Sequence, residues 1–147
     1  MTLGTVPATA GTARVEYMCG SVGPVISPRM FDVTITPPAT AHQGQTATIS
    51  ATVVQTVYPA TRPVPAGEYE AVFHVALEGA GVEKVRMDLT NPAIPAGELL
   101  RFSGSAQLTF PNTGTVSYRP DRFGYSMLGC IPRYPETVPV VATTRVS

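Results

Sequence analysis

The sequence predicts an all-β protein, built as a single antiparallel β-sandwich of about eight or nine strands. Three observations predict this fold class. Apolar and polar residues alternate along most of the chain, Thr and Val dominate the alternating segments, and proline or glycine ends nearly every one of them. Alternation with a period of two is the pattern of a strand with one buried face. Turn signals at intervals of roughly 8–12 residues are typical of a sandwich or a barrel.

The clearest strand lies within residues 64–79, in the middle of the chain. Its apolar side chains occupy alternate positions and therefore share one face: Tyr69, Ala71, Phe73, Val75 and Leu77. A helix would place these residues all around its axis rather than on one side. We therefore expect a long central strand whose apolar face meets the core and whose mixed face points outward.

The other strands follow from the same pattern. They are expected at residues 12–19, 31–36, 45–57, 82–90, 98–110, 115–118, 124–130 and 138–146. Gly104 lies in the middle of one of them and predicts a bulge or a bend. Residues 1–11 are rich in Thr, Ala and Gly and are expected to form a flexible arm. Residues 12–147 are expected to form one domain, with a hydrophobic core of its own.

A short motif occurs twice, as Val64-Pro-Ala-Gly-Glu and as Ile94-Pro-Ala-Gly-Glu. Proline presets φ at the second position of a β-turn, and glycine suits the fourth position of a type I turn. Both segments are therefore predicted to turn the chain sharply at the start of a strand. The flanking residues do not repeat, so we interpret the similarity as shared turn chemistry rather than as a duplicated unit.

The chain has two cysteines, Cys19 and Cys130. An even number of cysteines in an exported domain predicts a disulfide, whereas a cytosolic domain would keep two buried thiols. We predict the disulfide, which would close most of the chain into one loop and contribute about 4–5 kcal/mol at most. The cysteine spacing fits neither a CxxC redox motif nor a zinc site. We expect no metal and no cofactor.

Charge and hydropathy argue against two classes of partner. Charged residues make up 14% of the chain and the formal net charge is zero, so no basic face is expected to neutralise nucleic-acid phosphates. No run of about 18 apolar residues occurs, so we expect no membrane-spanning helix. The first residues lack the basic and apolar regions of a signal peptide. We expect that such a peptide was removed and that the protein is secreted, extracellular or attached to the cell surface.

The residues that usually carry catalysis are not grouped in the sequence. His42 lies in a turn, His74 lies on the outer face of the central strand, and no Gly-x-Ser-x-Gly motif occurs. Along a strand, His74 would be about 13 Å from Glu70 or Glu78, too far to share a metal ion. Carboxylates at strand ends, such as Glu68, are normally solvated. We therefore predict that the protein is not an enzyme.

Tyrosine and arginine gather in the last third of the chain, within residues 117–135. Mixtures of these residues are common in protein interfaces and in sugar-binding surfaces. Trp, the usual ring for stacking on sugars, does not occur in the chain. We predict a binding surface that includes Tyr118, Arg122, Tyr125 and Tyr134. The alternative is that these rings belong to the core and that the guanidinium groups are simply solvated.

Several short motifs occur in an order that resembles a known type of domain. Tyr17-Met-Cys19 leads to Gly23-Pro24 and to a Val-Thr-Ile-Thr strand, Gly44-Gln45 opens the next strand, and Cys130-Ile-Pro precedes a closing Val-Pro-Val segment. This order resembles the small secreted immunoglobulin-like β-sandwich domains of high-GC Gram-positive (actinobacterial) bacteria, many of which have no assigned function. The resemblance implies an extracytoplasmic domain with a disulfide from its first strand to its last hairpin. It implies no catalytic residue.

Taken together, the sequence favours a non-enzymatic structural or interaction module of a cell surface or an extracellular assembly. Its expected partner is another protein or a second copy of the chain. A carbohydrate-binding or cell-wall-binding domain, which would hold a surface glycan, is one alternative. A decoration domain of a phage or particle coat is another. A protease inhibitor that presents the proline-rich residues 58–65 is a third.

Overall fold

The computed structural model describes residues 9–21 and 26–147, and the predicted all-β fold is confirmed in them. The strands in these ranges are β1 (Gly11–Gly20), β2 (Ile26–Thr36), β3 (Thr40–Ala41), β4 (Thr46–Pro59), β5 (Glu70–Glu78), β6 (Lys84–Thr90), β7 (Leu99–Thr109), β8 (Gly114–Tyr125), β9 (Leu128–Pro132) and β10 (Ala142–Val146). A single 3₁₀ turn, Pro135–Thr137, follows β9. The predicted flexible arm, residues 1–11, lies mostly outside the described residues, and its last residue, Gly11, begins β1.

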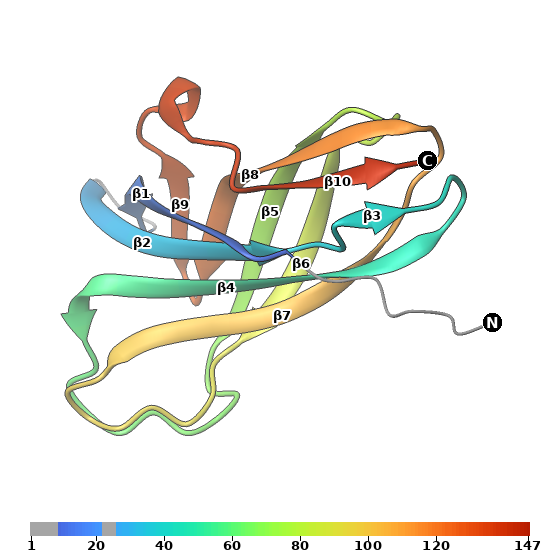
Figure 1. Cartoon of the computed structure of the whole chain (residues 1–147). Coiled ribbons are helices and arrows are strands. Elements are labelled where there is room, and N and C mark those ends of the chain that lie inside the picture. The colour runs from blue at the N-terminus through green and yellow to red at the C-terminus, as the bar shows by residue number, and fades with distance from the viewer. Residues whose placement is uncertain (1–8, 22–25) are drawn as a thin grey trace.

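The strands of the described residues form one hydrogen-bonded sheet in the order β3-β10-β8-β5-β6-β7-β4-β2-β1-β9. Strand β9 also pairs with β8, so the sheet returns on itself. Figure 1 shows two facing layers, with β1, β2, β4 and β7 crossing in front of β5, β6 and β8. Neighbouring strands are antiparallel, except for β3 and β10, which are parallel.

Strand β8 is the element that joins the two layers on one side. Its first half, residues 114–118, pairs with β10, and its last residues, 123–125, pair with β9. Its other edge pairs with β5 along most of the length, with a register shift between Phe73 and Val75 of β5. A strand of this length reaches from one layer to the other, which is why a single sheet can close around one core.

The side chains predicted to point inward do so. The alternating residues of β1, β2, β4, β5 and β6 that lie on the inner face are buried, from Val15, Tyr17 and Cys19 at the start to Val85, Met87 and Leu89. The ring of Phe123 lies at the centre, with its centroid 5.3 Å from that of Phe31 and 5.5 Å from that of Phe102. Burial of such aromatic rings is a dominant source of core stability in a small domain.

The end of the chain differs from the prediction. The two short strands expected at 115–118 and 124–130 are instead the hairpin of β8 and β9, turned by Ser126 with a φ of 54°. The closing strand expected at 138–146 begins only at Ala142. Pro139 lacks the backbone N–H that a strand pairing requires, so the chain is irregular up to this point. The two-residue strand β3 was not predicted, because it directly follows Pro37 and Pro38, which are typical of a turn.

Gly104 was predicted to mark a bulge or a bend; the bulge does not occur, and close approach of a neighbouring strand explains the glycine. It pairs with Ala51 on one side and with Leu89 on the other, and the register with β4 continues through it without a shift. A Cβ atom at this position would lie 2.3 Å from the carbonyl oxygen of Asp88. Glycine therefore lets β6 come close enough to β7 to join the two layers on their other side.

The two Pro-Ala-Gly segments form turns, but not of the predicted type. The amide of Glu68 donates to the carbonyl of Pro65, and the amide of Glu98 donates to the carbonyl of Pro95. Proline therefore occupies the first position of each turn and glycine the third, where φ is 76° at Gly67 and 88° at Gly97. A positive φ at the third position defines a type II turn, which glycine adopts without steric cost.

These two turns lie in loops that run side by side, one between β4 and β5 and the other between β6 and β7 (Figure 1). Val64 and Ile94 exchange both backbone hydrogen bonds, with N···O distances of 2.8 and 2.9 Å. Their side chains form a small cluster with Ala60, separate from the main core. The two copies of the motif thus lie in two loops that are paired by backbone hydrogen bonds at one end of the molecule.

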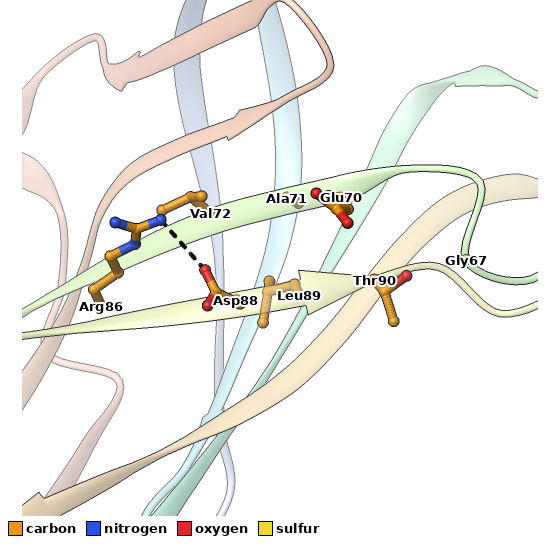
Figure 2. A pocket seen from close by; sticks show the side chains of 8 residues that line it. All are labelled: Gly67, Glu70, Ala71, Val72, Arg86, Asp88, Leu89 and Thr90. Atoms are coloured by element: carbon orange, nitrogen blue, oxygen red, sulfur yellow. Dashed lines mark hydrogen bonds and ion pairs between the residues drawn. The ribbon is translucent and has the colours of Figure 1, made fainter.

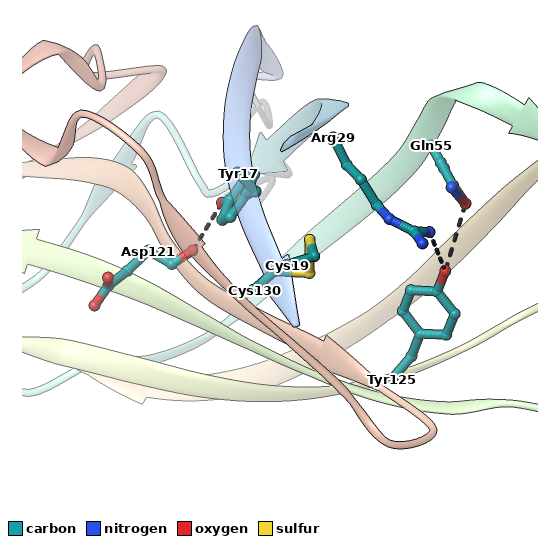
Figure 3. The surroundings of a disulfide bond; sticks show 7 residues. All are labelled: Tyr17, Cys19, Arg29, Gln55, Asp121, Tyr125 and Cys130. Atoms are coloured by element: carbon teal, nitrogen blue, oxygen red, sulfur yellow. Dashed lines mark hydrogen bonds between the residues drawn. A yellow bond between two sulfur atoms is a disulfide. The ribbon is translucent and has the colours of Figure 1, made fainter. Parts of the chain in front are cut away.

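The predicted disulfide between Cys19 and Cys130 is confirmed. The two residues face each other directly on β1 and β9, with their Cα atoms 4.1 Å apart, and both are buried. The hydroxyl of Tyr17 donates to the carbonyl oxygen of Asp121 at 2.7 Å beside it (Figure 3). The covalent bond therefore fastens the first strand to the last hairpin at the place where the sheet closes.

Candidate functional site

The structure does not bring the four predicted binding residues together. Tyr118 is fully buried, and its hydroxyl lies 2.7 Å from that of Thr144, so it belongs to the core and is removed from any binding surface. Arg122 and Tyr125 are three residues apart on β8 and therefore point to opposite faces of the sheet. Tyr134 lies beyond β9, exposed, with the guanidinium of Arg133 5.1 Å from its ring centre.

Arg122 lies on the outer face of the sheet, beside a shallow trough of about 330 Å³. The floor of the trough is formed by Gly124 and Gly129, which pair across β8 and β9, and Ile131 lies at its side, 56% exposed. His74 of β5 reaches the same trough. The trough is open to solvent, and its one charged lining residue, Arg122, is exposed. The trough therefore resembles an ordinary outer face of a sheet.

A wider hollow of about 540 Å³ lies on the outer face of β5 and β6 (Figure 2). Its charged groups are Glu70, Arg86 and Asp88. The ion pair between the last two measures 3.5 Å, and their side chains are 64% and 82% exposed. Such an exposed pair contributes little, because water screens it. Among the described residues, no group of three His, Cys, Asp or Glu side chains is placed to hold a metal ion.

The most distinctive polar site lies between the two layers, at the end of the core opposite Tyr118. Along each strand the inward positions are apolar until this end, where Phe31 gives way to Arg29, and Val53 to Gln55. The same step leads from Phe123 to Tyr125. Arg29, Gln55 and Tyr125 line a hollow of about 190 Å³, and Tyr58, Tyr69 and Leu100 are among its other lining residues. We call this hollow the Arg29 pocket.

The hydrogen bonds within the Arg29 pocket are long. The hydroxyl of Tyr125 accepts from Nη1 of Arg29 at 3.4 Å and donates to Oε1 of Gln55 at 3.5 Å, as Figure 3 shows. Typical values are about 2.9–3.0 Å for N–H···O and 2.7–2.8 Å for O–H···O. Three polar side chains therefore converge on one point without bonding closely, although Gln55 is only 1% exposed.

The guanidinium of Arg29 has no carboxylate partner among the described residues. Four arginines of these ranges form ion pairs with acidic side chains, and Arg29 is not one of them. Its Nε is buried and makes no hydrogen bond. The ring of Tyr58 lies 5.1 Å from the guanidinium carbon, which gives a cation–π contact on one face. The donors along the edge of the guanidinium remain available.

The wall of the pocket is held rigidly by the paired loops. Asn91 is 2% exposed, and its side chain accepts from the amide of Tyr69 at 2.8 Å and donates to the carbonyl of Pro65 at 2.9 Å. Tyr69 packs on the cluster of Val64 and Ile94. A buried amide with its hydrogen bonds made fixes the loop that carries it. The loosely bonded side chains of the pocket, Arg29, Gln55 and Tyr125, therefore lie beside a loop that is fixed by the hydrogen bonds of Asn91.

Burial and charge act in opposite directions on the central tyrosine. Burial raises the pKa of Tyr125, and the nearby positive charge of Arg29 lowers it by a smaller amount. The hydroxyl is therefore neutral at physiological pH and can both donate and accept a hydrogen bond. The pocket as a whole carries the uncompensated positive charge of Arg29.

Exposed apolar side chains belong to residues that line the pocket or adjoin its lining in the chain: Tyr58 lines it, Val57 precedes Tyr58, and Leu99 precedes Leu100. Val57 is 48% exposed, Tyr58 is 51% exposed and Leu99 is 37% exposed. Leu99 pairs with Pro59 across β7 and β4, so these residues lie on adjoining strands. We call Val57, Tyr58 and Leu99 the rim.

The sequence contained a signal for this site that differs from tyrosine and arginine content. Arg29 and Gln55 stand at inward positions of their strands, two residues from Phe31 and Val53, where alternation predicts apolar side chains. A polar residue at an inward position marks either the end of the core or a functional group. Of the four predicted residues, Tyr125 alone lines the pocket.

Within the parts of the chain that the structure describes, no helix has the length and apolar character needed to cross a membrane. Comparison of the chain with protein-family models, with curated proteins and with solved structures finds no match.

Proposed function

We propose that the protein is an exported, non-enzymatic interaction module of a cell surface or an extracellular assembly, and that it holds a partner protein at the Arg29 pocket. The observation that carries this proposal is the half-buried guanidinium of Arg29, which lies in a hollow without an ion-pair partner among the described residues. Arginine and tyrosine in a partly desolvated pocket are the residues that contribute most to binding in protein interfaces.

The rim supports a protein partner. Tyr58 lines the pocket, and the exposed Val57 and Leu99 adjoin residues that line it, so apolar surface lies next to a polar centre. In protein interfaces, apolar contacts of this kind shield a central anchor from water. The pocket lies on paired strands and loops rather than on a free chain end, so little conformational entropy would be lost on binding.

The disulfide supports the export part of the proposal. Disulfides persist in oxidising compartments and are rare in the cytosol. Cys19 and Cys130 are buried and lie directly opposite each other, so the bond fits the native strand pairing. A buried disulfide is compatible with an extracellular protein.

Copurification from the native source tests the proposal. Tagged wild-type protein is cross-linked in place, and its partners are compared with those of a Tyr58→Ser, Leu99→Ser double variant. We expect the wild type to retain a protein partner in near-equal amount and the double variant to lose about tenfold or more of it, as loss of rim residues requires. An Ile131→Ser variant removes a similarly exposed apolar residue from the outer trough and serves as the control.

Two results would contradict the proposal. Loss of the partner in the Ile131→Ser variant, with full retention by the double variant, would move the interface to the outer trough. An absence of any partner in the wild type would remove the interaction function. Mass spectrometry of the same material establishes whether Cys19 and Cys130 are oxidised and where the mature chain begins.

A carbohydrate-binding function is the second candidate, favoured by the side chains that line the pocket. Tyr125, Gln55 and Arg29 together offer hydroxyl, amide and guanidinium groups, which are common in sugar sites. A glycan array and a pull-down with insoluble cell-wall polysaccharide test it. Retention that is lost in a Tyr125→Phe, Gln55→Ala variant would support this function, and no retention on either support would exclude it.

A further inference from the structure

We infer that the Arg29 pocket receives a carboxylate, carried by an Asp or Glu side chain of the partner protein. This inference rests on the proposed function and specifies the chemistry of the partner at the pocket. It follows from the donors that the pocket leaves unused, from its charge and from its size.

The unused N–H donors of Arg29 fit a carboxylate. A guanidinium presents several N–H groups along its edge, in a geometry that matches the two oxygens of a carboxylate. In Arg29 one of these, on Nη1, reaches the hydroxyl of Tyr125 at the long distance of 3.4 Å, and Nε is buried without an acceptor. A buried donor without an acceptor is costly. The atoms that cover Nε would have to shift for a carboxylate to reach it, and the acceptor that the carboxylate supplies would offset that shift.

The charge of the site fits a single negative charge. Of the two arginines that line the pocket, Arg62 already binds Glu68 at 2.8 Å, and its side chain is 55% exposed. Arg29 alone is left uncompensated. A carboxylate matches this one charge, whereas a phosphate carries more negative charge and generally draws several cationic groups.

The size of the site fits a side chain. A volume of about 190 Å³ corresponds to roughly six water molecules at the volume each takes up in the liquid. This accommodates a carboxylate and its one or two methylene groups. The hydroxyl of Tyr125 can rotate its proton from the distant Gln55 to the incoming carboxylate, because the existing contact of 3.5 Å is weak.

The arginines that form ion pairs serve as an internal comparison. The side chains of Arg14, Arg86 and Arg133 are 61%, 64% and 42% exposed, and each already pairs with a carboxylate of this chain. Among the described residues, five arginines have no ion pair, and four of them, Arg101, Arg119, Arg122 and Arg145, are exposed, so water can solvate their guanidinium groups. Arg29 differs because its Nε is buried without an acceptor. A buried, unpaired guanidinium is expected if the missing carboxylate belongs to a partner.

The experiment titrates the full-length oxidised protein with model side chains and follows the Arg29 Nε–Hε signal by NMR. The probe is N-acetyl-glutamate methylamide, and its matched neutral control is N-acetyl-glutamine methylamide. We expect the glutamate probe to shift the signal saturably, at concentrations about tenfold or more below those needed for the glutamine probe, because a charge-assisted bond is the stronger one. The signal is assigned by its loss in Arg29→Lys.

Two variants and a control locate the effect. Arg29→Lys should weaken binding of the glutamate probe about tenfold, because an ammonium cannot replace a bidentate guanidinium. Since this variant lacks the Nε–Hε signal, its binding is followed by the side-chain amide signal of Gln55, which lines the same pocket and is titrated in the wild type for comparison. Gln55→Glu places a carboxylate inside the pocket, so it should pair with Arg29 and abolish probe binding while the fold remains. Arg119→Lys, an exposed arginine of β8 that does not line the pocket, should bind the probe as the wild type does.

The outcomes separate this inference from the proposed function. Equal shifts with both probes, no shift with either, or full binding by Gln55→Glu would overturn the carboxylate. Glucuronate and glucose form a further arm of the titration. If glucuronate saturates the signal at about a tenfold lower concentration than the glutamate probe, the carboxylate stands, and the protein partner is replaced by an acidic glycan.

Discussion

Two tyrosines of the same strand, Tyr118 and Tyr125 of β8, show two different uses of a buried hydroxyl. Tyr118 lies 2.7 Å from the hydroxyl of Thr144, which in turn donates to the carbonyl of Pro38 at 2.7 Å. Tyr125 makes two contacts of 3.4 and 3.5 Å, beside a buried Nε of Arg29 that has no partner. Both hydroxyls are near or within the core, but only the first is well bonded.

The difference shows where this fold is complete by itself. At the Tyr118 end, the hydrogen bonds run from Tyr118 to Thr144 and end on the backbone carbonyl of Pro38, so the polar groups stabilise the packing of β8, β10 and the segment before β3. At the Tyr125 end, the same layers leave donors without acceptors inside a rigid frame. Buried polar groups are nearly always satisfied in native proteins, so a group that is not satisfied is a candidate for a function.

The largest effect that sharpens this comparison is expected from removal of the disulfide. A Cys19→Ala, Cys130→Ala variant releases a loop of sequence separation 111 and should lose about 4–5 kcal/mol of unfolding free energy at most. Because Cys130 faces Phe123 on β8, amide exchange should rise more at Gly124 than at Tyr118. Urea denaturation and hydrogen exchange measure the two effects. Equal protection at both ends would mean that the bond does not support the pocket.

The next effect is a difference between two matched variants. Tyr118→Phe removes a close hydrogen bond from the core and should lower the unfolding free energy by about 1–3 kcal/mol. Tyr125→Phe removes only long contacts, and its loss should stay below about 0.5 kcal/mol. Urea denaturation at neutral pH compares them directly. A loss for Tyr125→Phe as large as that for Tyr118→Phe would show that the pocket is structural.

The smallest effect is the dependence of stability on alkaline pH. Burial raises the pKa of Tyr118 from 10.0 to about 12, and burial also raises the pKa of Tyr17. Between pH 10 and pH 12 the unfolded chain loses the Tyr118 proton while the folded chain keeps it, so unfolding becomes easier as pH rises. Below pH 10 this contribution is fully present.

Urea midpoints between pH 9 and pH 12 measure that dependence. We expect the midpoint of the wild type to fall with pH over the range from 10.0 to about 12, and that of Tyr118→Phe to fall less steeply. Tyr125→Phe should change the slope less, because burial is partly offset there by the charge of Arg29. Identical slopes in the wild type and in Tyr118→Phe would contradict the assignment of Tyr118 to a tightly bonded core site.

Much of the fold was predictable because alternation is a local property. The inward faces of β1, β2, β4, β5 and β6 follow from the sequence, since each depends only on residues two positions apart. The errors occurred where longer-range factors decide the structure. Gly104 was predicted to mark a bulge or a bend, although its pairing with β4 continues without a register shift and the close approach of β6 requires glycine there.

The sequence by itself determined an all-β chain, the inward side chains of most strands and a disulfide between two cysteines. Hydrophobic alternation and the number of cysteines can be read without knowing which strands pair with one another. Only the tertiary structure decided that β8 passes from one layer to the other and that Arg29, Gln55 and Tyr125 meet at one end of the core. Those residues lie on three strands whose neighbours are set by pairing over long sequence distances. Such pairing depends on the packing of the whole chain, and no short motif records it.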